Sequence, residues 1–218
     1  MTQTYEGDIR VYDALRTAVL VVDPYNDFLA DGGKLWPLIA DVAKSVKLHE
    51  NLSTIINTAR VAGLPIFIVP HHRSEPDDLK HWDHPTPFQR GSERIQAFAK
   101  GSWGGEWYPE FAPERGDIIV KEHWGSSGFA NTDLDLLLKQ KSVTHIILIG
   151  VIANTCIECT ARFGSEIGYH VTLVRDATAA ASTDAMHAAH ELNGPSFAHS
   201  IVTTAQLTAA LREMNESS

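Results

Sequence analysis

Six short hydrophobic runs place the strongest constraint on how this chain can fold. They are rich in valine, isoleucine and leucine, and they do not alternate between polar and apolar residues. They lie at residues 17–23, 65–70, 117–121, 144–150, 170–176 and 200–203. Strands that are apolar throughout are buried on both faces, as in a parallel sheet covered by helices on either side. The runs therefore predict six strands of such a sheet.

Segments with helical start and stop signals separate these runs. Helices are expected at residues 36–63, 133–140, 156–167 and 182–194, and after residues 203–204. Proline stands in the first turn of the first helix, Asn131 or Thr132 caps the second, and Gly168 ends the third. The alternation predicts an α/β fold, a doubly wound three-layer sandwich of Rossmann type around a six-stranded, mostly parallel sheet. At 24.0 kDa, residues 1–218 are expected to form a single domain.

Residues 71–107 interrupt this pattern. The segment is long for a connection between a strand and a helix, and it carries three of the five tryptophans. It also contains the histidines His71, His72, His81 and His84 and the glycine cluster GSWGGEW. Long ordered insertions of this kind commonly form lids or binding loops. We expect the segment to line a pocket.

Charge and cysteine content exclude several classes of function. The chain has 18 basic and 27 acidic side chains, a net charge of −9, which argues against a nucleic-acid or anionic membrane partner. No apolar run reaches the ~18 residues of a membrane span and no signal peptide is recognised, so a cytoplasmic location is expected. The two cysteines, Cys156 and Cys159, are too few for a disulfide scaffold or a four-cysteine zinc site.

Reactive side chains follow several of the predicted strands. Asp23 ends the first, His71 and His72 follow the second, and Cys156 begins the helix after the fourth. Ligands of parallel sheets bind beyond these carboxyl ends, and a helix start lowers the pKa of a cysteine thiol. Cys156 is thus a candidate nucleophile with Asp23 as its base, although a core cysteine and a loop-capping aspartate are the structural alternatives. Cys159, one turn further, is expected to pack in the core; a redox C-x-x-C pair is the alternative.

Three segments together resemble the isochorismatase-like cysteine hydrolases. They are VLVVDPYNDF at residues 19–28, SSGFANTDLDLLL at residues 126–138 and GVIANTCIECTARFGSEIGYHVTLVRDATAA at residues 150–180. The resemblance covers about residues 15–208, which are taken as the core of the domain. It extends to a branch with few assigned substrates that includes streptothricin hydrolase.

The resemblance implies an aspartate–lysine–cysteine triad. Asp23 is then the general base, and Cys156 attacks an amide or imide carbonyl to form an acyl-enzyme. It further implies a cis peptide between Val151 and Ile152, with the backbone N–H groups of Ile152 and Cys156 aimed at the oxyanion. Substrate contacts are expected from Tyr25, Phe28, His72, Trp103, Trp124 and Ala153.

The lysine of that triad has no unambiguous counterpart here. The motif spacing places His123 at its position, whereas Lys121 preserves the usual chemistry. In an extended strand both side chains point to the same face, so either is a candidate. A histidine makes activity depend on pH near neutrality, and a lysine does not.

The implied function is cysteine-dependent hydrolysis of a small amide, ureido or lactam substrate, at C–N bonds other than peptide bonds. No cofactor and no metal is expected, the only partner is the small-molecule substrate, and relatives suggest a homo-oligomer. Two alternatives remain open. One is a metal-assisted nicotinamidase-type amidase that uses histidines of residues 71–84, although its D-x-H motif is missing. The other is a catalytically silent binding relative.

Overall fold

A six-stranded sheet forms the centre of the computed structural model, which describes residues 12–216. Its strands are β1 (Thr17–Val22), β2 (Ile66–Val69), β3 (Ile118–Ile119), β4 (His145–Val151), β5 (His170–Ala179) and β6 (Ser200–Val202). They lie in the order β3-β2-β1-β4-β5-β6, and each neighbouring pair is parallel. The prediction of a doubly wound α/β fold is confirmed. Because the order reverses between β1 and β4, a crevice for ligands is expected beyond the carboxyl ends of these two strands.

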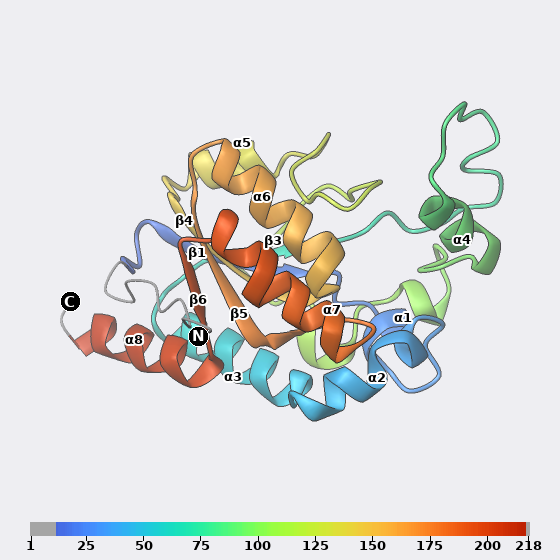
Figure 1. Cartoon of the computed structure of the whole chain (residues 1–218). Coiled ribbons are helices and arrows are strands. Elements are labelled where there is room, and N and C mark those ends of the chain that lie inside the picture. Colours follow the sequence, from blue (N-terminus) through green and yellow to red (C-terminus); the bar gives the residue numbers. More distant parts are fainter. Residues whose placement is uncertain (1–11, 217–218) are drawn as a thin grey trace.

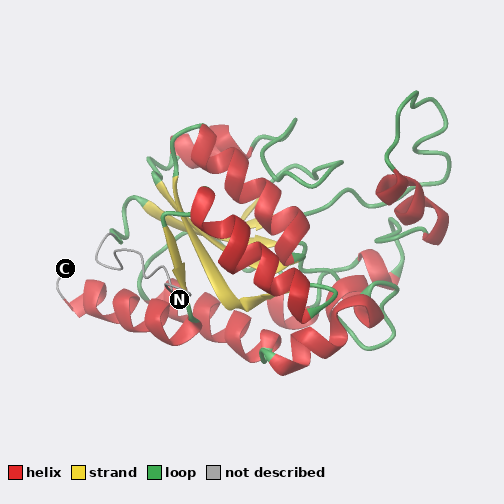
Figure 2. Cartoon of the chain, viewed as in Figure 1, coloured by secondary structure: helices red, strands yellow, loops and turns green. Residues whose placement is uncertain are grey.

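Helices cover both faces of the sheet (Figures 1 and 2). The α-helices of the described residues are α1 (Asn26–Leu29), α2 (Trp36–Ser45), α3 (Leu48–Val61), α4 (Pro87–Ile95), α5 (Leu134–Gln140), α6 (Glu158–Glu166), α7 (Thr183–His187) and α8 (Thr204–Glu216). Helices α2, α3 and α8 pack on one face, and α5 and α6 pack on the other. Within residues 12–216, no helix has both the length and the hydrophobicity that a membrane crossing requires.

The central strand shows why its sequence is uniformly hydrophobic. Val19 and Val21 belong to the core under α2, α3 and α8, whereas Leu20 and Val22 belong to the core under α5 and α6. Successive side chains of a strand point to opposite faces, so a strand between two helical layers needs apolar residues at every position. The six predicted runs were therefore correctly assigned as strands, although their ends differ from the prediction. β3 has only two residues, and β5 extends to Ala179.

Several element boundaries were predicted wrongly. The expected helix at residues 36–63 is two helices, because Lys47 adopts a left-handed conformation (φ +55°) between α2 and α3. Helix α5 begins at Leu134, and the Thr132 hydroxyl accepts a hydrogen bond from the Leu134 N–H. Cys159 is half-buried rather than packed in the core. The break at Lys47 arises because one residue leaves helical geometry, and the exposure of Cys159 depends on tertiary packing; hydrophobic periodicity reports neither.

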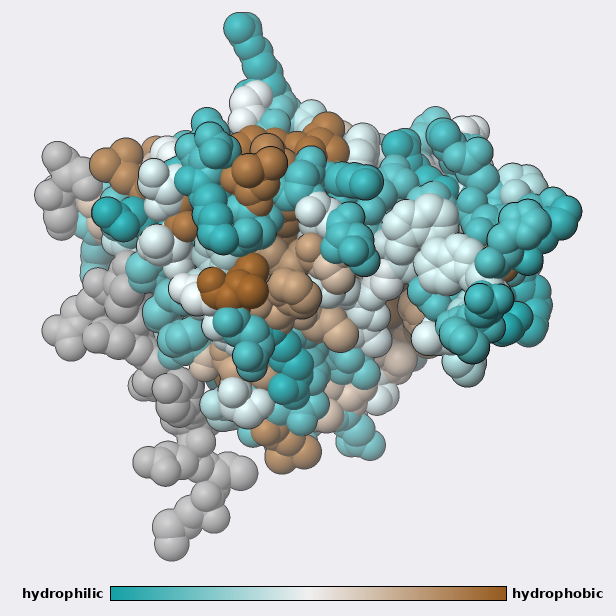
Figure 3. Space-filling view, turned by 90° about the horizontal axis from the view of Figure 1, so that it is seen from above, coloured by the Kyte–Doolittle hydropathy of each residue, from teal (hydrophilic) through white to brown (hydrophobic). Residues whose placement is uncertain are grey.

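The insertion after β2 carries α4 away from the sheet (Figure 1). Thr86 forms a capping box with Gln89 at the start of this helix, which has no buried residue. In the view of Figure 3, the end of the molecule that carries α4 is mainly hydrophilic, whereas hydrophobic side chains gather nearer the middle. Helix α4 therefore has no core of its own, whereas Ala97 and Phe98 after it are buried in the main core.

Three histidines stack at the amino ends of β4, β5 and β6. The ring centroids of His145 and His170 are 4.7 Å apart, and those of His170 and His199 are 4.6 Å apart. Burial and its two neighbours lower the pKa of His170 to about 4. This stack lies at the edge of the sheet opposite to the carboxyl ends of the strands.

Candidate active site

Two adjacent strands place the candidate catalytic residues beyond the edge of the sheet. Asp23 directly follows β1, and Cys156 lies shortly after β4; Val22 pairs with Gly150 in the register of these strands. Gly150 has φ +114°, and a Cβ there would collide with the backbone of Val22. Glycine therefore lets β4 approach β1 closely just before the chain turns toward the thiol.

Asp23 is fully buried and has a left-handed backbone (φ +56°). Its N–H donates to the Val69 carbonyl at 3.1 Å, and its own carbonyl accepts from the Tyr25 N–H at 2.8 Å. A positive φ is uncommon for a residue with a side chain and concentrates at functional sites. These backbone bonds hold the carboxylate between β1 and β4.

His123 supplies the basic side chain next to this carboxylate. Its Nε2 lies 3.1 Å from Asp23 Oδ1, and its Nδ1 lies 2.7 Å from the carbonyl oxygen of Gly125. Because a carbonyl only accepts, Nδ1 carries a proton; a second proton is shared between Nε2 and the carboxylate. Burial by itself lowers the pKa of His123, but the Asp23 carboxylate outweighs it and raises this pKa above the ordinary histidine value. The pair is best described as imidazolium and carboxylate.

Main-chain pairing fixes the position of His123. Its N–H donates to the Pro70 carbonyl at 2.9 Å, and its carbonyl accepts from the His72 N–H at 2.8 Å. Lys121 is exposed, and its N–H donates to Asp133. Of the two candidates for the triad cation, the structure thus places His123, and not Lys121, beside Asp23.

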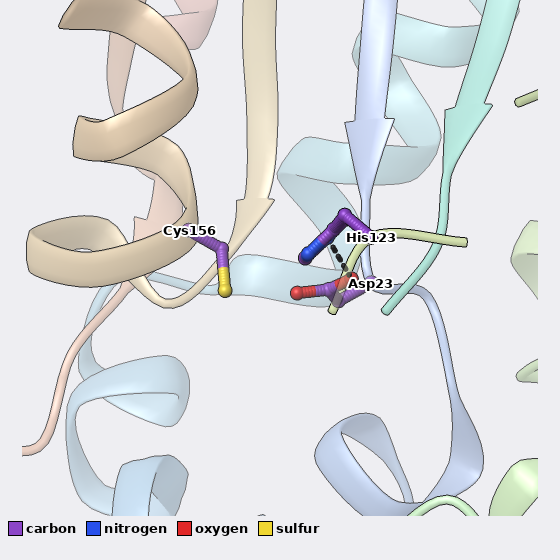
Figure 4. A group of neighbouring side chains, drawn as sticks. All are labelled: Asp23, His123 and Cys156. Carbon is purple, nitrogen blue, oxygen red and sulfur yellow. Dashed lines mark hydrogen bonds and ion pairs between the residues drawn. The ribbon is translucent and has the colours of Figure 1, made fainter. Parts of the chain in front are cut away.

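Cys156 completes the group from the other side (Figure 4). It lies in a π-helical stretch, Ala153–Ile157, that leads into α6, and it is 2% exposed. One side-chain oxygen of Asp23, Nε2 or Nδ1 of His123 and Cys156 Sγ all lie within 4.8 Å of one another. Oδ2 of Asp23 is buried without a hydrogen-bond partner. An acceptor that lacks a donor therefore lies next to a thiol that has a proton to give.

The thiol pKa departs from the prediction. A helix start was expected to lower it, but burial and then the Asp23 carboxylate raise the pKa of Cys156 well above the ordinary cysteine value. The Thr155 hydroxyl and the Ile152 backbone oppose this shift without reversing it. The thiol is therefore protonated at rest, and it needs a base at the moment of attack.

The peptide between Val151 and Ile152 is cis, as the resemblance implied. The carbonyl of Ile152 accepts hydrogen bonds from the N–H groups of Thr155 and Ile157 at 3.1 and 3.2 Å. These bonds begin the π-helical stretch, and they turn the backbone next to the thiol. An oxyanion role for the Ile152 and Cys156 N–H groups stays a prediction.

Comparison with known proteins assigns the family. Residues 17–206 match the isochorismatase domain. The chain belongs to the isochorismatase family. It is 27% identical over 213 residues to the ureidoacrylate amidohydrolase RutB of Caulobacter segnis, an alignment that covers 93% of this chain and 88% of that protein.

Two solved structures of the same type have a similar fold. One is a cysteine hydrolase from Pseudomonas syringae pv. phaseolicola, with a TM-score of 0.75 and 26% identity over 93% of this chain and 95% of that chain. The other is an isochorismatase-like hydrolase from Alkaliphilus metalliredigens, with a TM-score of 0.67 and 25% identity over 90% of this chain and 96% of that chain. The predicted family and fold are both confirmed.

Among the expected substrate contacts of this isochorismatase-family chain, three are buried. Tyr25 stacks on Trp107 with ring centroids 4.9 Å apart and donates its hydroxyl to the His71 carbonyl. Phe28 packs against Phe98 at 4.9 Å within the core, so the structure makes it a packing residue. Ala153 opens the π-helical stretch and is buried as well.

The other three expected contacts lie toward the insertion. The His72 and Trp124 rings stack with centroids 3.5 Å apart. His72 bonds to Asp78 and Glu122, and although burial by itself lowers its pKa, these carboxylates raise it. Trp103 is 51% exposed and contacts the site through its backbone, whose carbonyl accepts from the Asn26 side chain. His72 and Trp124 line a recess beside α4, together with His71, Ser74, Asp78, Leu79, Phe88, Gln89, Ser92 and Glu93.

Asp27 is a residue whose importance sequence reasoning did not identify. Its carboxylate accepts from the Phe98 N–H at 2.7 Å and from the Lys34 N–H at 3.0 Å. A Cβ at Gly104 would collide with the same carboxylate. Asp27 thus ties the carboxyl-terminal part of the insertion, and the turn before α2, to α1. The paired glycines of GSWGGEW were the available signal, because adjacent glycines often mark a close backbone approach.

The histidines of residues 71–84 do not form a metal-ligand cluster with one another. Among residues 12–216, the group at Asp23 is the one set of three histidine, cysteine or acidic side chains with metal-ligand spacing. His71 Nδ1 contacts the His72 carbonyl, and burial lowers the pKa of His71. The arrangement after β2 therefore gives no support to the metal-assisted nicotinamidase alternative.

Proposed function

We propose that this isochorismatase-family chain hydrolyses a small amide or ureido substrate through an acyl-enzyme on Cys156. The observation that carries the proposal is the unpartnered Oδ2 of Asp23 beside the buried thiol. A buried carboxylate oxygen without a donor is costly, and a proton from the thiol or from water relieves that cost. Acyl transfer by a cysteine needs such an acceptor.

The first half of the reaction uses Asp23 as the base and Cys156 as the nucleophile. Asp23 takes the thiol proton as Sγ attacks the carbonyl carbon, and the C–S bond forms. The backbone N–H groups of Ile152 and Cys156 are proposed to hold the resulting oxyanion. The proton then passes from Asp23 to the departing amine or ammonia as the C–N bond breaks, which leaves a thioester on Cys156.

The second half repeats the sequence with water. Asp23 removes a proton from water, the hydroxide adds to the thioester, and the thiolate departs and recovers the proton. His123 stays an imidazolium throughout. Its hydrogen bond fixes Oδ1 of Asp23, so that Oδ2 faces the thiol.

The substrate class is supported by chemistry and by similarity. A relative that shares 27% identity is named as a ureidoacrylate amidohydrolase, and a ureido group presents the same planar carbonyl flanked by nitrogen as a carboxamide. A lactam fits the same mechanism, with the amine retained on the opened product. A cytoplasmic location, a homo-oligomeric assembly and a single-domain organisation of residues 1–218 stay predictions.

A substrate screen with two readouts tests the proposal. Ammonia release is measured over small carboxamides and ureido acids, with ureidoacrylate among them, and lactams are followed by mass spectrometry. The positive compounds are then mixed with the enzyme and quenched rapidly, and intact mass spectrometry is expected to show one acyl group, located on the peptide that contains Cys156. Turnover by Cys156→Ala, which has no thiol to form the acyl-enzyme, would reject the mechanism. A chain that turns over none of these compounds, with an unreactive Cys156, would favour the silent binding relative.

A further inference from the structure

We infer that Asp23, His123 and Cys156 also form a binding site for one Zn²⁺ ion, and that the bound ion blocks the thiol. The three residues offer an oxygen, a nitrogen and a sulfur ligand within 4.8 Å of one another, and all three are buried (Figure 4). The inference shares its residues with the proposed function. It can be tested by measuring metal binding, which does not require the enzyme to turn over a substrate.

The donor set selects the class of metal. A thiolate and an imidazole favour Zn²⁺, Cd²⁺ and Co²⁺ over Mg²⁺ and Ca²⁺, which prefer oxygen ligands alone. Zinc bonds of ~2.0–2.3 Å require neighbouring ligand atoms roughly 3–4 Å apart in a tetrahedral site. His123 Nε2 and Asp23 Oδ1 already lie 3.1 Å apart. Cys156 Sγ lies within 4.8 Å of both groups, so it moves toward them when the ion binds.

The surroundings of the three ligands match those of metal sites. A metal-bound histidine commonly donates its other ring N–H to a carbonyl, which orients the ligating nitrogen. His123 Nδ1 makes that bond to the Gly125 carbonyl at 2.7 Å. Independently, Oδ2 of the fully buried Asp23 has no hydrogen-bond partner and faces the thiol. An ion between the three side chains would supply what this oxygen lacks.

The site depends on a histidine at position 123. A lysine ammonium at the same place carries three donors and no lone pair, so it pairs with a carboxylate but does not ligate an ion. The histidine that replaces the lysine of related triads can do both. Protonated, it is the cation beside Asp23; unprotonated at Nε2, it is a ligand.

Binding exchanges protons for the ion. Zn²⁺ displaces the thiol proton and the proton shared between His123 and Asp23, and forms bonds to Sγ, Nε2 and a carboxylate oxygen. Two protons are released to solvent, and water completes the fourth position. The sulfur lone pair and the base are then both engaged, so the ion acts as a reversible inhibitor that a chelator removes.

Cobalt is the probe that reports the ligands directly. Chelator-treated full-length protein is titrated with Co²⁺, and a thiolate-to-metal charge-transfer band with tetrahedral d–d bands is expected at one ion per chain. Calorimetry with Zn²⁺ on the same samples gives the affinity. Cys156→Ser is expected to remove the charge-transfer band and to weaken Zn²⁺ binding by about 100-fold or more. His123→Lys is expected to weaken Zn²⁺ binding to a similar extent. Mg²⁺ is expected not to bind.

Matched controls separate this site from other ligands on the protein. Cys159→Ser removes the other thiol, and His199→Ala disrupts the histidine stack at the opposite edge of the sheet; both are expected to leave the band and the affinity unchanged. In the wild-type protein, Zn²⁺ is expected to protect Cys156 from alkylation. This measurement needs no variant, so it remains decisive even if a variant fails to fold. A band lost in Cys159→Ser, binding lost in His199→Ala, or alkylation unaffected by bound Zn²⁺ would each overturn the inference.

Discussion

His123 changes what the buried carboxylate can do. In an aspartate–lysine pair the cation remains charged far above neutral pH, whereas an imidazolium is lost within the range where enzymes are assayed. Burial by itself lowers the pKa of His123, but the Asp23 carboxylate raises it above the ordinary value, so the charge is lost at a higher pH than that of a free histidine. The titratable groups around it include Asp23, Glu122 and Cys156. Activity should therefore carry an alkaline limb that belongs to this residue.

The variant His123→Lys tests that limb. We expect the alkaline limb of the kcat/KM profile to move to higher pH in this variant, because lysine titrates near 10 when unperturbed. Overall activity is expected to fall, since the ammonium does not reproduce the bond to Gly125. An alkaline limb that stays in place would assign it to another group, with the thiol as the first candidate.

The roles of Cys156 and Asp23 have a more direct test. Cys156→Ala and Asp23→Asn are each expected to reduce turnover below about 1% of the starting value, because neither the nucleophile nor the base has a substitute within reach. Circular dichroism checks that the fold is kept. Cys159→Ala is the matched control and should retain activity, since Cys159 lies outside the group. Residual turnover of several per cent in either site variant would contradict the assigned role.

At the level of the elements, the approach of β4 to β1 depends on Gly150. Gly150→Ala adds strain at φ +114° and a collision with the Val22 backbone. We expect a loss of at least about 3 kcal/mol in the free energy of unfolding, measured by urea denaturation. The matched control is Gly168→Ala, where φ is +96° but no atom lies within 4 Å, and about 1–2 kcal/mol is expected. Equal losses in the two variants would show that strain alone, and not the close approach, accounts for Gly150.

The elements also show how far sequence reasoning reaches. The six strands and their parallel arrangement followed from apolar runs, because burial on both faces leaves a direct mark on composition. The break at Lys47 and the half-buried Cys159 could not be predicted, because both depend on one backbone angle or on tertiary packing. In the site, too, some features are marked in the sequence and others depend on tertiary contacts. Asp23 and Cys156 were placed by motifs and strand ends, whereas the choice between His123 and Lys121 needed the pairing of residue 123 with the chain after β2.

The pKa of the Cys156 thiol shows a further reason why a prediction from sequence can fail. A helix start predicts a lowered pKa, and the Thr155 hydroxyl and the Ile152 backbone do act in that direction. Complete burial and the facing carboxylate are larger, and neither can be estimated until the fold brings Asp23 to Cys156. Burial and the facing carboxylate therefore reverse the predicted direction of the thiol pKa shift, whereas the role of Cys156 as the reacting group stays a prediction.

At the scale of the whole molecule, the histidine stack couples stability to pH. The pKa of His170 falls from 6.5 to about 4 on folding, so the folded state binds fewer protons than the unfolded state between these values. This contribution to stability is fully present above about pH 6.5 and is lost as the pH falls toward 4. We expect the melting temperature to drop over this range, and to drop less in His170→Gln. His187→Gln, at an exposed histidine, is the control and should leave the slope unchanged.

The three proposed catalytic residues come from distant parts of the chain, which has a consequence for how the protein matures. Asp23 comes from the first strand of the chain, His123 from the segment after the insertion, and Cys156 from beyond the fourth strand, and they meet only when the centre of the sheet has closed. A nascent or partly folded chain therefore holds a thiol without its base. Enzymatic activity regained on refolding is therefore expected to report the pairing of β1 with β4 rather than the formation of any helix.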